Sequence, residues 1–183
     1  FEADELKVEW SHITEGAVLG GGAFAQVHAI DLRGHAGPAL ALKKTDVGQV
    51  LPNQRASLLS SVRREVRTLR RLNHECVITL YGVVSVPGRF MGLVMDRADR
   101  GSLREVLDDD PSVVTSELSV QMRFAADIAS ALAYLHSFSP PKLHHDLKSA
   151  NVLIFEREPG VLRAKLSDFG LSKDLHGTSV GAT

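Results

Sequence analysis

The chain has 183 residues, 44% of them hydrophobic, which is enough to bury the core of one domain. Lys and Arg number 21 against 22 Asp and Glu, so the formal net charge of −1 gives no bulk attraction to nucleic acid or to an anionic membrane. Cys76 is the single cysteine, which excludes an internal disulfide framework and favours a reducing, cytoplasmic location. No apolar run approaches the roughly 20 residues that span a bilayer, so no membrane segment is expected in this chain.

The first part of the chain carries strand signals that surround one basic helix. Residues 17–47 alternate apolar and small residues around glycines, which predicts a three-strand antiparallel meander. Residues 48–56 resemble a loop. Two more strands are predicted at 77–85 and 90–96. Between them, apolar residues recur at the helical spacing on a strongly basic segment. These residues are Leu58, Val62, Val66, Leu69 and Leu72.

The second part is mainly helical at first. A short helix is predicted at 103–107 and a long one at 119–137, which ends before Pro140-Pro141. Short strands near 152–155 and 163–166 then flank two polar loops.

A glycine-rich segment, Leu-Gly-Gly-Gly-Ala-Phe-Ala-Gln-Val, runs from Leu19 to Val27 between two predicted strands. Small residues let backbone N–H groups approach phosphate oxygens closely, which would suit a nucleotide. An ordinary glycine-rich hairpin explains the same residues. The context between two strands argues against a dinucleotide-binding loop, because such a loop opens a helix.

Lys43 ends an apolar strand, and Glu65 lies on the basic helix with arginines on both sides. Taken singly, they read as a surface lysine and a solvated glutamate. The functional alternative pairs them, so that Glu65 holds the Lys43 ammonium against the α- and β-phosphates of a nucleotide.

Two polar motifs are far more specific. The first runs from His144 to Asn151, His-His-Asp-Leu-Lys-Ser-Ala-Asn, and the second is Ser-Asp-Phe-Gly at 167–170. The eight fixed letters they share with H-x-D-L-K-x-x-N and D-F-G arise by chance at a given register with a probability on the order of 10⁻¹⁰. Phosphoryl transfer needs one carboxylate to accept the hydroxyl proton, and a second carboxylate plus an amide oxygen to hold Mg²⁺. Asp146, Asp168 and Asn151 fit these roles in that order.

Taken in chain order, these features resemble the protein kinase family over residues 10–183. The resemblance implies one partial kinase domain over 1–183 with an α+β, bilobal fold. A β-rich N-lobe with one long helix would occupy about 14–98, and the first part of a mainly helical C-lobe would occupy 99–183. It also implies ATP and Mg²⁺, or Mn²⁺, as cofactors, and a protein substrate.

The resemblance implies a Ser/Thr substrate, because Lys148 stands where tyrosine kinases carry other residues. Lys148 would contact the transferred phosphate, and the catalytic set would be Asp146, Lys148, Lys43 and Glu65. Trp10 and the form of both polar motifs are most similar to the tyrosine-kinase-like branch, whose members are mostly Ser/Thr-specific.

The resemblance also implies a nucleotide site. Met95 would be the gatekeeper, the Asp96 carbonyl and the Ala98 N–H would face the adenine edge, and Val27, Ala41 and Leu153 would enclose the ring. The full set of implied ATP-binding residues is Leu19, Gly20, Gly21, Gly22, Ala23, Phe24, Ala25, Val27, Ala41, Lys43, Met95, Asp96, Ala98 and Leu153. An apolar column linking the lobes would consist of Leu69, Leu80, His144 and Phe169.

Three departures from the family pattern stand out. Ala25 replaces the third glycine, and its methyl is expected to restrict a backbone with φ > 0. His145 replaces the arginine that usually reads an activation-loop phosphate, so the kinase would be non-RD. The chain ends at Thr183, before any A-P-E motif, so the fragment alone is expected to be inactive, with the apolar face of its long helix partly exposed. Ala25 and His145 also keep open a nucleotide-binding pseudokinase or scaffold.

Overall fold

The computed structural model describes residues 6–22, 25–48 and 50–175. The chain forms two compact units. The first unit comprises Phe1–Asn73 and Ile78–Asp99, and the second comprises His74–Val77 and Arg100–Thr183. The two predicted lobes follow one another along the chain. In the structure, the short segment His74–Val77 lies within the first stretch of sequence but belongs to the second unit.

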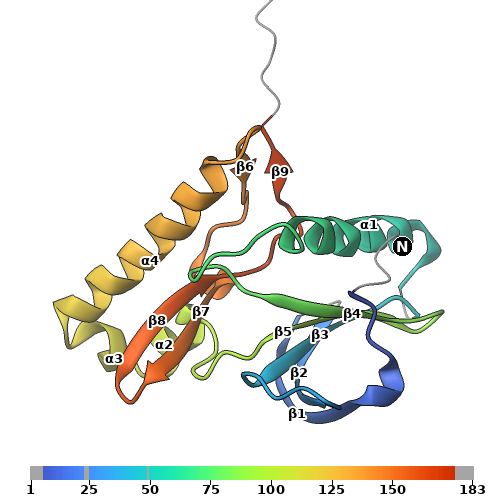
Figure 1. The fold of residues 1–183 in the computed structure, drawn as a ribbon, viewed down its shortest axis with the longest axis horizontal. Coiled ribbons are helices and arrows are strands. Elements are labelled where there is room, and N and C mark those ends of the chain that lie inside the picture. Colours follow the sequence, from blue (N-terminus) through green and yellow to red (C-terminus); the bar gives the residue numbers. More distant parts are fainter. Residues whose placement is uncertain (1–5, 23–24, 49, 176–183) are drawn as a thin grey trace, which may run out of the picture. The chain divides into compact units, whose positions relative to one another are not determined.

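The first unit is built on a five-stranded antiparallel sheet (Figure 1). Its order is β1-β2-β3-β5-β4, so the last strand of the chain's first unit lies inside the sheet. The predicted meander and the two further strands are confirmed, with starts at Ile13 and Leu80 in place of 17 and 77. The strands are β1 (Ile13–Gly21), β2 (Ala25–Leu32), β3 (Leu40–Asp46), β4 (Leu80–Val86) and β5 (Phe90–Asp96).

The two faces of this sheet have different coverings. Leu40 and Leu42 of β3 point into a core cluster with Phe90, and Trp10 packs on Phe90 with its ring centroid 5.0 Å away. Successive side chains of a strand point to opposite faces, so Lys43 lies on the other face. Val8 and Trp10, which precede β1, therefore help to cover the face of Leu40 and Leu42. The Lys43 side chain projects from the opposite face.

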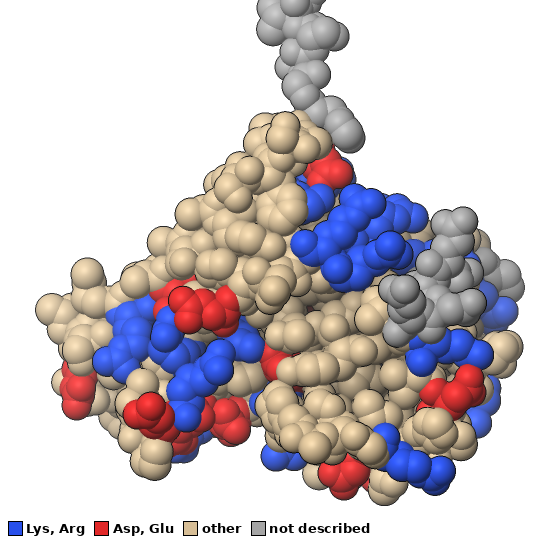
Figure 2. Space-filling model, viewed as in Figure 1, with Lys and Arg blue, Asp and Glu red and all other residues tan. Residues whose placement is uncertain are grey.

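Helix α1 (Pro52–Leu69) begins earlier than the sequence predicts. The predicted loop 48–56 is wrong from residue 52 onward, because a proline at the first helical position starts the helix with its fixed φ. Val62, Val66 and Leu69 are buried, which confirms the predicted apolar face, and α1 contacts β4. Arginines occupy the exposed side, and Figure 2 shows Lys and Arg side chains gathered over α1.

The second unit combines three helices with two small sheets. The predicted short and long helices are α2 (Leu103–Asp109) and α4 (Leu118–His136). Between them, α3 (Ser112–Thr115) was not predicted, because four residues are too few to show a helical period. The long helix packs on β8 with Phe124 and Leu135 of its predicted apolar face buried, while Leu118 and Met122, on another side, are exposed.

Two antiparallel strand pairs complete this unit. The hairpin of β7 (Val152–Glu158) and β8 (Val161–Leu166) is longer than the predicted strands, and Gly160 turns it with φ of 79°. The short strands β6 (Lys142–Leu143) and β9 (Lys173–Asp174) pair on either side of the two polar motifs. Across the described residues, no helix is both long and apolar enough to cross a membrane.

Candidate active site

Lys43 and Glu65 form a salt bridge inside the first unit. The Lys43 Nζ donates to both carboxylate oxygens of Glu65, at 2.9 and 3.0 Å. Only 5% of the Glu65 side chain is exposed, so the carboxylate stabilises the ammonium in a largely dry position. The structure thus brings the two residues together and excludes the interpretation that they are two unrelated surface charges. Their contact with phosphates stays a prediction.

The glycine-rich segment forms the turn between β1 and β2. Gly20 pairs with Val27 and Gly21 with Gln26, and the Gly22 N–H donates to the Ala25 carbonyl at 2.8 Å. Ala25 has no positive φ in this structure, so its methyl introduces no left-handed strain. The effect of Ala25 on the mobility of the loop stays a prediction. Ala23 and Phe24 lie outside the described residues.

The predicted nucleotide-facing residues of the first unit share one face of the sheet. Val27 pairs directly with Lys43, and Ala41 pairs directly with Met95. Directly opposed residues of antiparallel strands project to the same side, and Ala41 is two residues from Lys43 on one strand. Val27, Ala41 and Met95 therefore accompany Lys43, as a nucleotide site on that face requires. Leu19 lies on β1, and Leu153 lies on β7 in the second unit.

At the end of β5, the Asp96 side chain is already engaged. Its carboxylate accepts hydrogen bonds from the Tyr81 hydroxyl at 2.8 Å and from the Thr79 N–H at 3.2 Å. The residue is buried, so the side chain is not available to a ligand. Any contact of Asp96 with a nucleotide must come from its backbone, as predicted. The roles of Asp96 and Ala98 in binding adenine stay predictions.

In the second unit, Asp146 is held by two neighbours. Its Oδ2 accepts from the Lys148 Nζ at 2.7 Å and from the Asn151 Nδ2 at 2.9 Å. The hydrogen bond from Lys148, followed by that from Asn151, holds the pKa of the Asp146 carboxyl below its ordinary value, although burial alone acts the other way. Within the described residues, no donor bonds to Asp146 Oδ1. This oxygen is the one placed to accept a proton.

Asn151 ends the short helix η3 (Ser149–Asn151) and is buried. Its Nδ2 donates to the Asp146 carbonyl at 2.8 Å as well as to the Asp146 carboxylate. Both partners are acceptors, so this atom must be the amide nitrogen, and Oδ1 is left as the acceptor. An amide oxygen fixed in this way is suited to a hard cation such as Mg²⁺.

Asp168 is tied to Asn151 through Ser167, a residue that the sequence analysis did not assign. The Ser167 N–H and Oγ both donate to the Asn151 carbonyl, at 2.8 and 3.0 Å. The predicted metal residues therefore belong to adjoining segments. Carboxylate and amide oxygens at two positions fit Mg²⁺, which usually takes one or two protein ligands and completes its shell with water and phosphate.

His144 and Phe169 form the second-unit half of the predicted apolar column. Their rings meet edge to face with centroids 4.8 Å apart, and both residues are buried. His144 Nδ1 accepts the Asp146 N–H at 3.2 Å, so Nε2 carries the proton and donates to the Ser167 carbonyl at 2.8 Å. Burial lowers the pKa of His144, which keeps the ring neutral. Leu69 and Leu80 lie in the first unit, and the complete column stays a prediction.

His145 and Asp168 are the described non-glycine residues with positive φ, at 63° and 62°. Non-glycine residues avoid the left-handed region, and such strain persists where surrounding structure enforces it. One of these residues precedes Asp146 and the other is the predicted metal ligand. The backbone outliers therefore coincide with the two polar motifs singled out by sequence.

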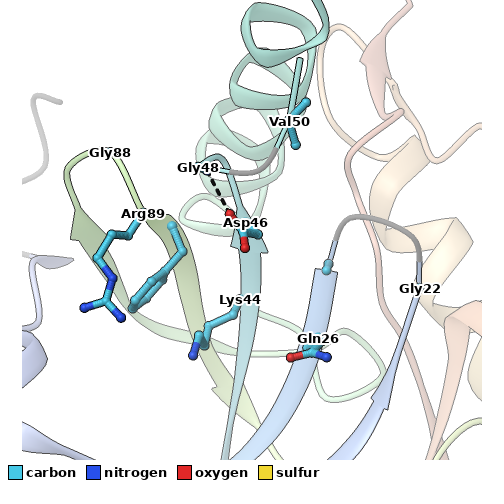
Figure 3. Close-up of a pocket in the computed structure, with 10 residues that line it drawn as sticks. Gly22, Gln26, Lys44, Asp46, Gly48, Val50, Gly88 and Arg89 are labelled. Carbon is cyan, nitrogen blue, oxygen red and sulfur yellow. Dashed lines mark hydrogen bonds between the residues drawn. The ribbon is translucent and has the colours of Figure 1, made fainter. Parts of the chain in front are cut away.

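A pocket of about 630 Å³ in the first unit includes two predicted nucleotide-binding residues, Gly22 and Ala25, but not Lys43 (Figure 3). Lys44 and Asp46 line it, and these alternate with Lys43 and Thr45 along β3. Lys44 and Asp46 therefore enter the pocket from the face opposite Lys43.

Two supporting interactions in the second unit escaped the sequence analysis, although the sequence carries signals for both. Ser102 and Glu105 form a reciprocal capping box that starts α2, and the Ser-x-x-Glu spacing is its signature. Asp127 is a charged residue on the buried face of α4, next to Phe124 and Ala131. A charge at a core position indicates a partner of opposite charge, and that partner is Arg163.

The model of the protein kinase domain family matches residues 13–182. This chain belongs to the protein kinase family. The kinase domain thus has the α+β fold expected from its motifs, and its family uses ATP with a divalent metal to phosphorylate proteins.

Named relatives support this assignment. The chain is 30% identical over its whole length to "Calmodulin-binding receptor-like cytoplasmic kinase 2" of Arabidopsis thaliana and covers 42% of that protein. It is 27% identical over 94% of its length to "Serine/threonine-protein kinase CTR1" of the same plant, covering 20% of that protein. It is 32% identical over 98% of its length to "PTI1-like tyrosine-protein kinase 1", also from Arabidopsis, covering 50% of it. The chain therefore spans half or less of these relatives.

Proposed function

We propose that the protein containing this kinase domain transfers the γ-phosphate of ATP to Ser or Thr hydroxyls of a protein substrate. The observation that carries the proposal is the setting of Asp146. Its Oδ2 is held by Lys148 and Asn151, and its Oδ1 is left without a donor among the described residues. A low carboxyl pKa keeps the group ionised at neutral pH, as a proton acceptor must be.

In this proposal, Asp146 orients the attacking hydroxyl and receives its proton. Lys148, with 54% of its side chain exposed, can move from the Asp146 carboxylate to the transferred phosphate, where negative charge develops. Lys43, held by Glu65, would fix the α- and β-phosphates. These four residues make up the proposed catalytic set.

Asn151 Oδ1 and the Asp168 carboxylate are the proposed ligands of Mg²⁺ or Mn²⁺. A bound divalent cation neutralises phosphate charge during transfer. The protein's part is to present two oxygens in fixed directions. Asn151 meets this need because its side-chain amide nitrogen donates two hydrogen bonds to Asp146. Its backbone carbonyl accepts a hydrogen bond from the Ser167 hydroxyl.

The Ser/Thr preference rests on Lys148, and the relatives' names point both ways. One is named a serine/threonine-protein kinase and another a tyrosine-protein kinase. The test is phosphoamino-acid analysis of generic protein substrates after incubation of the full-length protein with radiolabelled ATP, alongside its Asp146→Asn variant. Label on Ser and Thr that depends on Asp146 is expected. Label mainly on Tyr would overturn the preference, and equal label in both proteins would overturn the transfer.

The alternative is a pseudokinase or scaffold that binds nucleotide without transferring phosphate. His145 is the residue that favours it, since Ala25 causes no backbone strain here. ATP binding with no Asp146-dependent label on any residue would select this alternative.

We also propose a cytoplasmic location. One relative bears the word cytoplasmic in its name, and the buried Cys76 is a free thiol, which suits a reducing compartment.

A further inference from the structure

Arginines form a stripe along the exposed side of α1. Its members Arg63, Arg67, Arg70 and Arg71 are all exposed, whereas Val62, Val66 and Leu69 of the same helix are buried. Residues three, four, seven and eight apart share one side of a helix. Arg70 keeps helical dihedrals beyond the last residue of α1, so the side continues past its end. Figure 2 shows this concentration of positive charge.

The stripe has no counter-ions within the described residues. No ion pair or side-chain hydrogen bond involves any of its members there, and the only acid of α1, Glu65, is buried against Lys43. Like charges spaced by four residues repel and destabilise a helix. Attraction to the C-terminal end of the helix dipole accounts for basic residues in the last turn, but Arg63 stands before that turn. The repulsion is relieved when an anionic partner binds.

The spacing of the stripe suits an extended acidic peptide. Arg63 and Arg67 are about 6 Å apart along the helix axis, from a rise of about 1.5 Å per residue, and Arg70 and Arg71 continue into the turn that follows α1. In an extended chain, side chains on one side recur every two residues, about 6.7 Å. Acidic side chains at alternate positions therefore match the spacing of Arg63 and Arg67, and further acidic residues of the same peptide can reach Arg70 and Arg71. Each guanidinium can also grip a carboxylate through two hydrogen bonds.

Other anionic partners fit less well. Surface binding to a membrane combines basic residues with large exposed apolar ones, but the residues three, four and seven before Arg63 are the exposed Ser60, the half-buried Leu59 and the small Ala56. Leu51 is exposed, but it stands before the first turn of the helix, twelve residues from Arg63. Nucleic-acid binding favours an overall positive charge, and the chain carries a formal net charge of −1.

We propose that Arg63, Arg67, Arg70 and Arg71 form a docking stripe for a segment of a partner protein with Asp or Glu at alternate positions. The proposal goes beyond phosphoryl transfer, because it concerns binding by a face of α1 other than the one that carries Glu65.

Fluorescence anisotropy would test the stripe on the full-length protein. The probe is a fluorescein-labelled ten-residue peptide with Glu at alternate positions, and a peptide with Gln at those positions is the negative control. The protein variants are R63Q/R67Q and a matched control, R33Q/R157Q, which removes the same charge from exposed arginines elsewhere. Vesicles containing phosphatidylserine are assayed in parallel.

The stripe predicts binding of the Glu peptide that weakens about tenfold or more in R63Q/R67Q and less than about threefold in R33Q/R157Q. Binding should also weaken as salt is raised. Equal weakening in the two variants, equal binding of the Gln peptide, or no peptide binding at all would each overturn the proposal. Stripe-dependent binding to vesicles without peptide binding would overturn it in favour of a membrane partner.

Discussion

Hydrogen bonds around His144 set the positions of both polar motifs. The neutral ring accepts the N–H of Asp146 and donates to the carbonyl of Ser167, which in turn holds Asn151. A protonated ring would have two donors and could no longer accept from Asp146. One buried imidazole therefore couples the proposed proton acceptor to the segment that carries Asp168.

The neutral state of His144 predicts a pH dependence of stability. Burial lowers its pKa below 6.5, so below that pH the unfolded chain binds more protons than the folded one. Stability from this group is therefore present above about pH 6.5 and lost as pH falls. His144→Phe keeps an aromatic ring against Phe169 but cannot titrate. The free-energy difference between wild type and variant, measured by urea unfolding, should shrink from pH 7.5 to 5.5, and a constant difference would contradict this account.

Lys43 is expected to matter for catalysis more than for the fold. Lys43→Met should lower kcat/KM of the full-length protein by about 100-fold or more, because it removes the charge proposed to hold the phosphates. It also leaves Glu65 buried without this partner, so K43M/E65Q is needed to restore stability without restoring activity. Lys44→Met, on the opposite face of β3, should stay within about threefold of wild type. Near-normal transfer by K43M would remove Lys43 from the site.

At the level of elements, an ion pair between the buried Asp127 and the half-buried Arg163 fastens α4 to the β7–β8 hairpin. The Asp127 carboxylate accepts from the Arg163 side chain at 2.7 Å and from the Ala164 N–H at 2.9 Å. Burial would raise the pKa of Asp127, but these hydrogen bonds outweigh it and hold the pKa below the ordinary value. The hairpin in turn carries Asn151 and Asp168 at its ends, so the pair helps to position the proposed metal ligands.

Removing one partner of this pair should destabilise the second unit. Asp127→Ala leaves Arg163 without its carboxylate and is expected to cost about 3 kcal/mol of unfolding free energy. The comparison is Arg104→Ala, which breaks the exposed pair with Asp108 within α2 and should cost only about 0.5 kcal/mol. Chemical denaturation of both variants measures the difference. Equal losses would show that burial of Asp127 does not govern its contribution.

Periodicity in the sequence was enough to predict most elements but not their neighbours. The helix at α4 and the strands β1 to β5 follow from apolar spacing, whereas the insertion of β5 between β3 and β4 depends on pairing that no local pattern encodes. The start of α1 was missed because residues 52–56 lack apolar spacing, and only the proline marks the first turn.

Candidate site residues could be named from motifs where chemistry fixes residue type, and their roles stay predictions. Asp146, Asn151 and Asp168 stood out because their spacing leaves few alternatives. Lys43 and Glu65 did not stand out by themselves, because lysine and glutamate are common surface residues. Only the fold shows that the Lys43 Nζ and the Glu65 carboxylate lie 2.9 Å apart. Ser167 and Asp127 escaped notice because their roles depend on what lies across from them.

For the whole molecule, His145 bears on regulation. It is exposed at the position where the family usually has an arginine that reads an activation-loop phosphate. We expect activity of the full-length protein to be independent of phosphate on Thr178, Ser179 and Thr183, which lie outside the described residues, because histidine cannot grip a phosphate with two hydrogen bonds. The measurement compares kcat of phosphatase-treated protein and of T178A/S179A/T183A with that of untreated wild type. A drop of about 100-fold or more in either would contradict it.

The most direct test of phosphoryl transfer by this domain is the effect of Asp146→Asn on full-length protein, with ATP affinity measured beside turnover. Asn preserves the size of the side chain and removes its basicity, so the account predicts that Kd for Mg·ATP changes less than about threefold. It predicts that kcat falls by about 100 to 10,000-fold, the usual contribution of a positioned proton acceptor. Unchanged turnover in Asp146→Asn, or wild-type turnover no higher than that of the variant, would contradict the assignment of Asp146 and of the activity built on it.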